Sequence, residues 1–193
     1  MHFRRLAQIW HRFCADRTAT AVTELALVAP VLILLYCGAY TISDAAACNR
    51  KVSRVSRTIA DTTSRYAAVT TTDLTTILDN SALVLAPYQT AKGSMRISQV
   101  QVTDASHAKV VWSKAKNGAA LATGASVTLP TNLVPALMLP DLTKTPAKAG
   151  TFFLMAEVSY SYTPLFGATI MPAPTLYSKV YMLPRLSDSV PLG

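Results

Sequence analysis

Apolar residues form their longest run near the N-terminus, over residues 20–42, and the run contains one charged side chain, Glu24. A helix over its uncharged part, Leu25 to Ile42, spans about 27 Å. The hydrocarbon core of a bilayer is roughly 30 Å thick. A secretory signal peptide carries a shorter apolar region, of about 7 to 15 residues. The pattern therefore predicts one membrane-spanning helix, without cleavage of the chain after the apolar run.

Beyond this run, apolar and charged residues continue at helical spacing on opposite sides of one helix. The apolar set is Val52, Val55, Ile59 and Tyr66, and the charged set is Arg50, Arg54, Arg57, Asp61 and Arg65. The membrane helix is therefore expected to continue to about Tyr66, over about 45 residues and roughly 70 Å. Its apolar stripe would pack on a globular domain. Asp61 is placed to pair with Arg65 one turn later.

A second helix is expected after a threonine-rich stretch. Thr72 or Asp73 can cap its N-terminus, and Pro87 stops it. Apolar residues recur between these points at Leu74, Ile77, Leu78 and Leu85. The spacing predicts a short amphipathic helix.

After Pro87 the apolar residues alternate with polar ones, which is typical of strands. Two strands joined by the turn Asp104–His107 form a predicted hairpin. A polar linker with Asn117-Gly118 and Thr123-Gly124 follows, and two further strands end the domain. The four strands are Met95–Thr103, Ala108–Ser113, Phe152–Tyr162 and Leu176–Leu183. We expect an α+β fold with a long N-terminal helix, a second helix and a mainly antiparallel sheet of about four strands.

Composition agrees with a membrane-anchored globular protein: 51% of the 193 residues are hydrophobic and 15% are charged. The net charge is +8, and residues 1–19 supply +3 of it from four arginines and one aspartate. The other lysines and arginines are scattered among Ser, Thr and Ala instead of forming the basic face that nucleic-acid binding needs. We therefore expect no nucleic-acid partner.

Residues 1–19 form a basic amphipathic leader. Phe3, Leu6, Trp10 and Phe13 follow helical spacing, and basic residues fill the other side. Such a helix suits an anionic inner leaflet, and the positive-inside rule then favours a cytoplasmic N-terminus. Four basic residues also follow the span, namely Arg50, Lys51, Arg54 and Arg57. Charge counting alone therefore does not fix the orientation.

The sequence offers little for catalysis. His2 and His11 lie in the leader, so His107, in a predicted turn, is the one histidine available to the globular part. The chain has no G-x-S-x-G nucleophile elbow, no metal-ligand spacing and no phosphate-binding glycine loop. We expect a protein that is not an enzyme and that uses no cofactor or metal. A membrane-tethered hydrolase using His107 is kept as a minor alternative.

Two stretches resemble the TadE/TadG-like pseudopilins of the tight-adherence (Tad, Flp pilus) system. The first runs from Arg17 through Ala19, Thr20 and Glu24 into the apolar segment. The second comprises Val158–Phe166 and Leu176–Arg185, with a Tyr-x-Tyr-x-Pro-Leu element and a closing Pro-Arg. In that family a prepilin peptidase leaves glutamate as the fifth residue of the mature chain. The resemblance therefore implies cleavage between Ala19 and Thr20, although the residue before the cut is commonly glycine.

The resemblance implies a minor pilin-like structural protein of Flp pilus assembly, held in the bacterial inner membrane by one helix. Its N-terminus would be cytoplasmic and its C-terminal domain periplasmic. The expected partners are the membrane, other pilin-like subunits, the prepilin peptidase and the Tad secretion machinery. The organisation is a leader (1–19), a transmembrane helix (20–42), its periplasmic continuation (43–69) and a globular domain (70–193). After cleavage, the Thr20 amine and Glu24 of a neighbouring subunit would neutralise each other.

Several alternatives stay open. The chain can instead be an unprocessed single-pass anchor whose periplasmic domain binds another envelope protein, which Ala19 in place of glycine favours. Cys37 is expected to pack in the span, whereas Cys48 is either a free thiol or an intermolecular bridge. Two tyrosine pairs, Tyr160 with Tyr162 and Tyr177 with Tyr181, form either an aromatic cluster holding the sheet or a protein-facing patch. Arg185 is either a partner contact or a surface charge.

Overall fold

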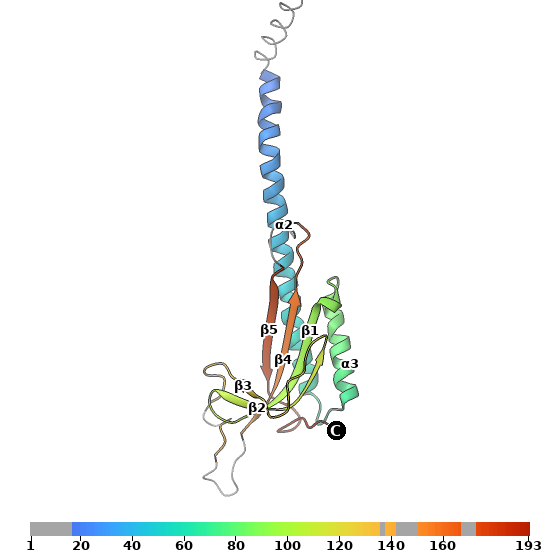
Figure 1. Ribbon diagram of the computed structural model, residues 1–193, viewed down its shortest axis with the longest axis vertical. Helices are drawn as coiled ribbons and strands as arrows, with labels where there is room; N and C mark the ends of the chain where they lie inside the picture. Colours follow the sequence, from blue (N-terminus) through green and yellow to red (C-terminus); the bar gives the residue numbers. More distant parts are fainter. Residues whose placement is uncertain (1–16, 136–137, 142–149, 167–172) are drawn as a thin grey trace, which may run out of the picture.

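A computed structural model describes residues 17–135, 138–141, 150–166 and 173–193. It has one long helix that rises out of a small α+β domain (Figure 1). This helix, α2, runs from Arg17 to Ser64 without a break at Pro30. Its N-terminal half stands clear of the domain, and its C-terminal half packs on the sheet. Residues 1–16 of the predicted leader lie outside the described residues, and its last three residues begin α2.

The C-terminal half of α2 buries the apolar stripe that the spacing predicts. Val52, Val55 and Ile59 are fully buried, and Asp61 binds Arg65 Nη2 at 2.7 Å as expected. The inclusion of Tyr66 in that stripe was wrong, because the helix ends at Ser64. Hydrogen bonds of the i to i+3 type from the Arg65 and Tyr66 amides tighten the last turn and leave Tyr66 37% exposed.

The second helix, α3, spans Thr71–Ala82 and continues into a 3₁₀ turn, η1, at Leu83–Leu85. Its cap is Thr70, not Thr72 or Asp73 as expected. The Thr70 hydroxyl accepts from the Asp73 amide at 3.1 Å while Asp73 accepts from the Thr70 amide at 2.9 Å. Asp73 therefore serves as the third residue of a capping box, a role that needs a hydroxyl three residues earlier.

The sheet has five antiparallel strands in the order β3-β2-β1-β4-β5. Their bounds are Gly93–Val102 for β1, His107–Lys116 for β2, Ser126–Thr128 for β3, Phe152–Ser161 for β4 and Thr175–Met182 for β5. The four predicted strands are present. The fifth, β3, pairs with the start of β2 from within the expected polar linker. A short 3₁₀ turn, η2 (Thr90–Lys92), leads into β1.

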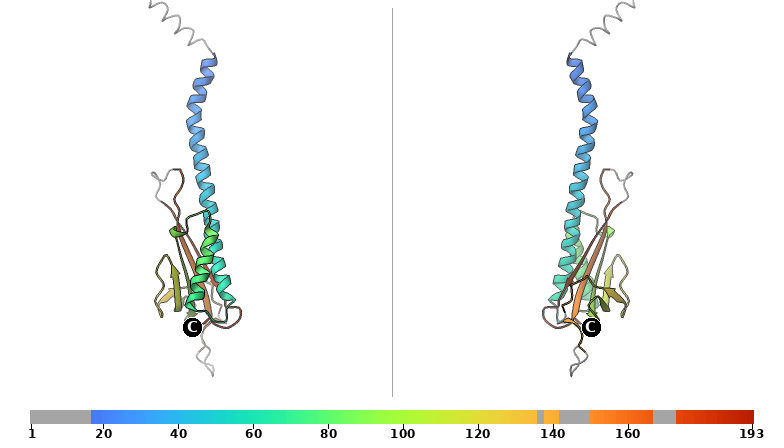
Figure 2. Two further views of the ribbon diagram at one scale, coloured as in Figure 1. Left: turned by 90° about the vertical axis from the view of Figure 1, so that its right-hand side faces the viewer. Right: turned by 90° about the vertical axis from the view of Figure 1, so that its left-hand side faces the viewer.

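Different elements pack on the two faces of the sheet. Helices α2 and α3 lie on one face (Figure 2), where Met95, Ile97 and Val158 are buried against them. The register of β1 with β2 shifts after Gln99, so that Val111 is an extra residue without a cross-strand partner. Because of this bulge, Val110 faces the side of the sheet away from the helices. There it joins a second apolar cluster with Phe153. Segments flanking β3 cover that cluster.

The C-terminal residues pass beneath the domain at the end of α2. The Arg185 amide donates to the Ser64 carbonyl at 2.9 Å, and the amides of Val69 and Gly193 bond across a short parallel bridge. Val190 is fully buried, and its carbonyl accepts from Trp112 Nε1 at 2.7 Å. The tail therefore closes the core below α2.

Candidate functional site

The exposed half of α2 is the first candidate site. None of its most apolar stretch is buried, and by length and composition it is the one helix among the described residues that is able to cross a membrane. Its large apolar side chains are 43–78% exposed. They are Val22, Leu25, Leu27, Val28, Val31, Leu32, Ile33, Leu34, Leu35, Tyr36, Tyr40 and Ile42. A surface of this size in contact with water is unfavourable, and its length and composition are compatible with a single membrane-spanning helix.

The predicted processing and pairing residues all lie in this part of α2. Ala19 and Thr20 fall in its first turns, and Glu24 lies one turn after Thr20 with its side chain exposed. Cleavage between Ala19 and Thr20 would therefore leave nearly the whole helix in place. Pairing of Glu24 with a neighbouring Thr20 amine stays a prediction.

A cluster of phenols surrounds the carboxylate of Asp44, two residues beyond the apolar run. Tyr162 Oη, just after β4, donates to Asp44 Oδ2 at 2.7 Å. Tyr88 Oη, between η1 and η2, donates to Oδ1 at 2.8 Å. The rings of Tyr88 and Tyr160 make an edge contact, with their centroids 6.2 Å apart. We call Asp44, Tyr88, Tyr160 and Tyr162 the Asp44 collar.

The collar resists loss of the phenolic protons. Burial, reinforced by the hydrogen bonds to Asp44, raises the pKa of both Tyr88 and Tyr162 well above the ordinary value near 10. The sequence reasoning missed this site, although Asp44 is the one carboxylate between Glu24 and Asp61. A carboxylate placed directly after an apolar run was the available signal.

The Asp44 collar also borders Cys48, which is fully buried and free. Burial and the nearby Asp44 charge raise the pKa of its thiol to about 11. An intermolecular bridge through Cys48 is therefore contradicted by the structure, because the sulfur has no access to solvent. Cys37, in the exposed half of α2, is partly exposed.

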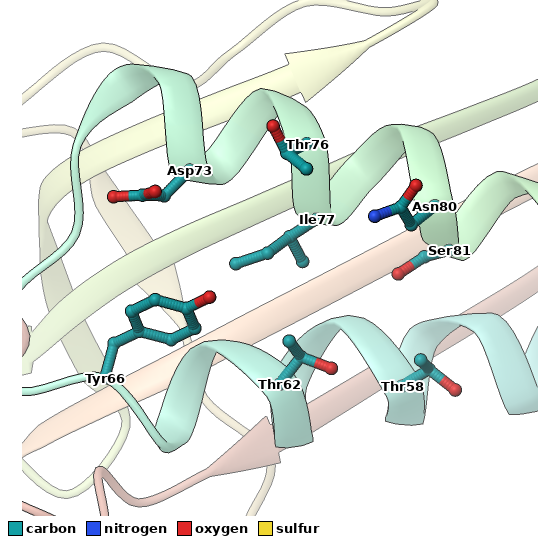
Figure 3. A pocket seen from close by; sticks show the side chains of 8 residues that line it. All are labelled: Thr58, Thr62, Tyr66, Asp73, Thr76, Ile77, Asn80 and Ser81. Carbon is teal, nitrogen blue, oxygen red and sulfur yellow. The ribbon is translucent and has the colours of Figure 1, made fainter.

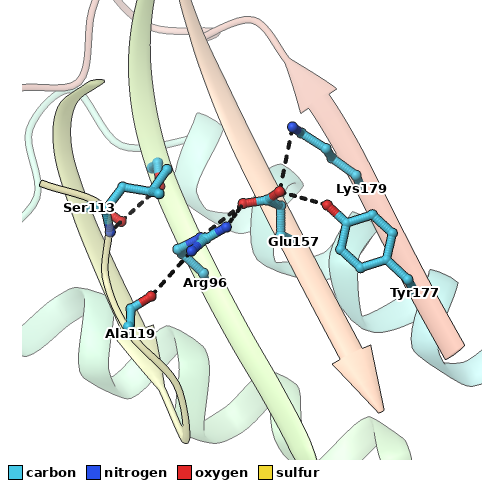
Figure 4. A network of polar contacts seen from close by, with 8 residues as sticks. Arg96, Ser113, Ala119, Glu157, Tyr177 and Lys179 are labelled. Carbon is cyan, nitrogen blue, oxygen red and sulfur yellow. Dashed lines mark hydrogen bonds and ion pairs between the residues drawn. The ribbon is translucent and has the colours of Figure 1, made fainter. Parts of the chain in front are cut away.

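The face of the sheet away from the helices carries a second polar cluster (Figure 4). Glu157 on β4 accepts two hydrogen bonds from Arg96, one from Nη2 and one from Nε, the latter at 2.8 Å. It accepts a third from Tyr177 Oη at 2.6 Å. Lys179 Nζ lies 3.4 Å from the same carboxylate. Burial alone would raise the pKa of Glu157, but the hydrogen bonds from Tyr177 and Arg96 and the positive charges of Lys179 and Arg96 lower it.

The predicted tyrosine pairs therefore lie on opposite faces. Tyr160 and Tyr162 share the helix-facing side and are buried in the main core, which favours the cluster that holds the sheet. Tyr177 and Tyr181 share the outer side, where Tyr177 is exposed apart from its bond to Glu157. Arg185 forms an ion pair with Asp61 at 2.7 Å within the chain, so it joins the last strand to the end of α2.

A hydroxyl-lined groove of about 250 Å³ lies between α2 and α3 (Figure 3). Thr58 and Thr62 from α2 face Thr76 and Ser81 from α3. The groove contains no histidine or cysteine, and its one carboxylate, Asp73, is engaged in the cap of α3. These residues offer no nucleophile and base pair.

The other predicted chemical groups are engaged in local structure. His107 is exposed beside the turn, and its Nδ1 lies 3.0 Å from Asp104. Asp79 binds Lys116 Nζ at 2.6 Å, on a different side of α3 from the cap at Asp73. Within the described ranges, no three His, Cys, Asp or Glu side chains lie close enough together to hold a metal ion. That the chain is not an enzyme stays a prediction.

Comparisons with protein-family models, with curated proteins and with solved structures gave no match.

Proposed function

We propose that this chain is a minor pilin-like structural protein of Tad/Flp pilus assembly, anchored in the bacterial inner membrane by α2 and processed by a prepilin peptidase. The observation that carries the proposal is a single continuous helix with two different halves. One half is apolar and exposed, and the other is packed in the domain. A subunit that stands in a membrane and later packs beside like helices needs this division.

The charge on Glu24 supports assembly through the helix. A carboxylate at the centre of a bilayer costs on the order of 2.5 to 3.5 kcal/mol, and less near an end. Glu24 lies near the start of the apolar run, and cleavage before Thr20 would bring it close to the positive end of the helix dipole, which offsets part of that cost. A free amine at Thr20 would supply a full opposite charge. An apolar bundle of like helices would then hold paired rather than isolated charges.

The expected orientation places residues 1–19 in the cytoplasm and the globular domain in the periplasm. This orientation rests on the pilin-like resemblance, because four basic residues flank the apolar run on each side and charge counting does not decide it. The domain would then bind other pilin-like subunits and the Tad secretion machinery. Because the polar clusters are engaged in holding the fold, we assign the protein a structural role and no catalytic one.

One observation favours a second function. Ala19 stands where the family commonly has glycine before the cut. Without cleavage, the chain would be a permanent single-pass anchor whose periplasmic domain binds another envelope protein. The exposed half of α2 serves this function equally well.

The two functions differ in the N-terminus of the protein in its native membrane. We expect the chain purified from cells with an active prepilin peptidase to begin at Thr20, and the chain from cells without it to begin at Met1 or His2. An Ala19→Gly variant, which restores the common residue, serves as the positive control and should be processed at least as completely. A chain that keeps its leader in both strains, while Ala19→Gly is cut, would establish the permanent anchor.

A further inference from the structure

Residues 162–166, which follow β4, extend from the sheet toward the exposed half of α2 (Figure 2). The base of this segment is closed by a hydrogen bond from the Tyr162 amide to the Pro174 carbonyl at 3.0 Å. Lys92 Nζ also donates to Thr163 Oγ1 at 3.1 Å. Together with the bond from Tyr162 to Asp44, these contacts fix where the segment leaves the domain.

Its first residues present an apolar surface beside α2. Leu165 is 69% exposed and Phe166 is 43% exposed. The ring of Phe166 makes an edge contact with the ring of Tyr40, with centroids 5.8 Å apart. Tyr40 is itself 44% exposed, so the two rings form a pair with open faces.

The position of the Tyr40–Phe166 ring pair along α2 determines how deep the pair lies in the membrane. Tyr40 lies two residues before the end of the uncharged run, which is about 3 Å along a helix. Asp44, which receives the Tyr162 hydroxyl, lies one turn further out. If residues up to Ile42 occupy the hydrocarbon core, Phe166 lies at the boundary between acyl chains and headgroups. Aromatic rings are enriched at that boundary, and small apolar surfaces bury there to about 5–10 Å.

We propose that Leu165 and Phe166 insert into the periplasmic leaflet of the bilayer and give the domain a second membrane contact beside α2. This inference rests on the anchoring part of the proposed function. We commit to lipid as the occupant because Phe166 contacts Tyr40, which lies two residues before the end of the uncharged run, at the level where aromatic rings meet the headgroups. A domain held at two points would stand at a fixed angle to the membrane.

The test places single tryptophans in the full chain and reconstitutes it in vesicles of phosphatidylcholine and phosphatidylglycerol with acyl chains brominated near the headgroup. The chain has two tryptophans, so a Trp10→Phe background leaves only Trp112, which is buried. The reporters are Leu165→Trp and Phe166→Trp. Tyr36→Trp reports the exposed half of α2, and Tyr66→Trp, beyond the far end of α2, is the matched control in water.

We expect emission from the reporters at 165 and 166 and from the one at 36 to be quenched in brominated lipid, because aromatic side chains at these positions lie at or within the membrane boundary. Emission from Tyr66→Trp should be unchanged. If Tyr36→Trp is quenched but neither Leu165→Trp nor Phe166→Trp is, the second contact is disproved and the anchor stands. If Tyr36→Trp is not quenched, the anchor itself fails and the inference with it. A blue-shifted but unquenched signal at 165 and 166 that reverses when protein is diluted in lipid would show a second copy as the occupant and overturn the proposal.

Discussion

Tyr162 donates its phenolic hydrogen to Asp44 Oδ2 at 2.7 Å, joining residues that are 118 positions apart. The other carboxylate oxygen accepts from Tyr88 at 2.8 Å. One carboxylate at the base of the exposed half of α2 therefore holds both the end of β4 and the segment between η1 and η2. Because both phenols are raised in pKa and stay protonated, these bonds persist over the whole neutral range.

Replacing Asp44 by alanine should destabilise the domain by about 1–3 kcal/mol, because two phenols shielded from water lose their acceptor. Asp44→Asn keeps one carbonyl oxygen and should cost about half as much. The free energy of unfolding is measured by urea titration of the detergent-solubilised chain. Thr41, on the same part of α2, donates to the Cys37 carbonyl of its own helix, so Thr41→Ala is a matched control with a smaller effect. Equal stability of Asp44→Ala and the parent would contradict a holding role.

The collar also predicts sensitivity to alkali. The pKa of Tyr88 and Tyr162 in the folded state is raised by burial and by the bonds to Asp44, whereas unfolded tyrosines titrate near 10. Above pH 10 the unfolded chain therefore binds fewer protons than the folded one, and stability falls as pH rises. A Tyr88→Phe, Tyr162→Phe double variant should show a flatter decline between pH 9 and about 11 in thermal unfolding followed by circular dichroism. A parallel decline in both proteins would rule out this linkage.

Much of the fold follows from local periodicity. The apolar stripe of α2 and the four longer strands were predicted because each buries one side of a regular element, and that side is visible in the spacing. The cap of α3 was misplaced because Thr70, Thr71 and Thr72 offer three adjacent hydroxyls. Strand β3 was missed because three residues are too few to show alternation.

The contacts that join distant segments were not predictable in the same way. The contact between Asp44 and Tyr162 depends on the packing of the sheet against α2. No local sequence pattern around either residue identifies the other as its partner. Arg185 was left open between a partner contact and a surface charge, and its ion pair with Asp61 depends on the C-terminal segment returning to the end of α2. Such contacts follow from topology rather than from the spacing of neighbours in the sequence.

Glu157→Gln should lower stability at neutral pH by about 2 kcal/mol. Breaking a buried pair costs about 3–5 kcal/mol, but the Arg96 side chain is 28% exposed and recovers part of its hydration. The pKa of Glu157 is lowered in the folded state, so its contribution is present above the unfolded value of 4.5 and is lost as pH falls through the lower folded value. Urea titrations at pH 7 and at about pH 3 should therefore show the variant and the parent converging.

Lys179→Met is the matched control for that prediction. Lys179 lies at 3.4 Å from Glu157, a longer ion pair without the paired hydrogen bonds that Arg96 makes. Its removal should cost less than about 1 kcal/mol. A larger loss from Lys179→Met than from Glu157→Gln would show that the Arg96 pair is not the main stabilising contact of this cluster.

Trp112→Phe should loosen the C-terminal tail. The indole N–H is shared by Gln99 Oε1 at 2.6 Å and the Val190 carbonyl at 2.7 Å, and the substitution leaves both acceptors in a buried site at a cost of about 1–3 kcal/mol. Hydrogen exchange of the Val69 and Gly193 amides, which bond across the tail, should accelerate. Val111→Ala, at the neighbouring exposed bulge, is the control. Unchanged exchange at both amides in Trp112→Phe would contradict this account.

Glu24→Gln tests whether charge pairing drives assembly. The substitution keeps the size of the side chain and removes its charge, so insertion of α2 into the membrane becomes easier rather than harder. We therefore expect normal amounts of the variant in the membrane but a loss of its incorporation with other pilin-like subunits, measured by crosslinking in the native host and by counting pili. Because Glu24→Asp retains the charge at a shorter reach, it should keep part of the incorporation. Normal incorporation of Glu24→Gln would refute the pairing with the Thr20 amine, whereas a fall in its membrane level would place the role of Glu24 in insertion instead.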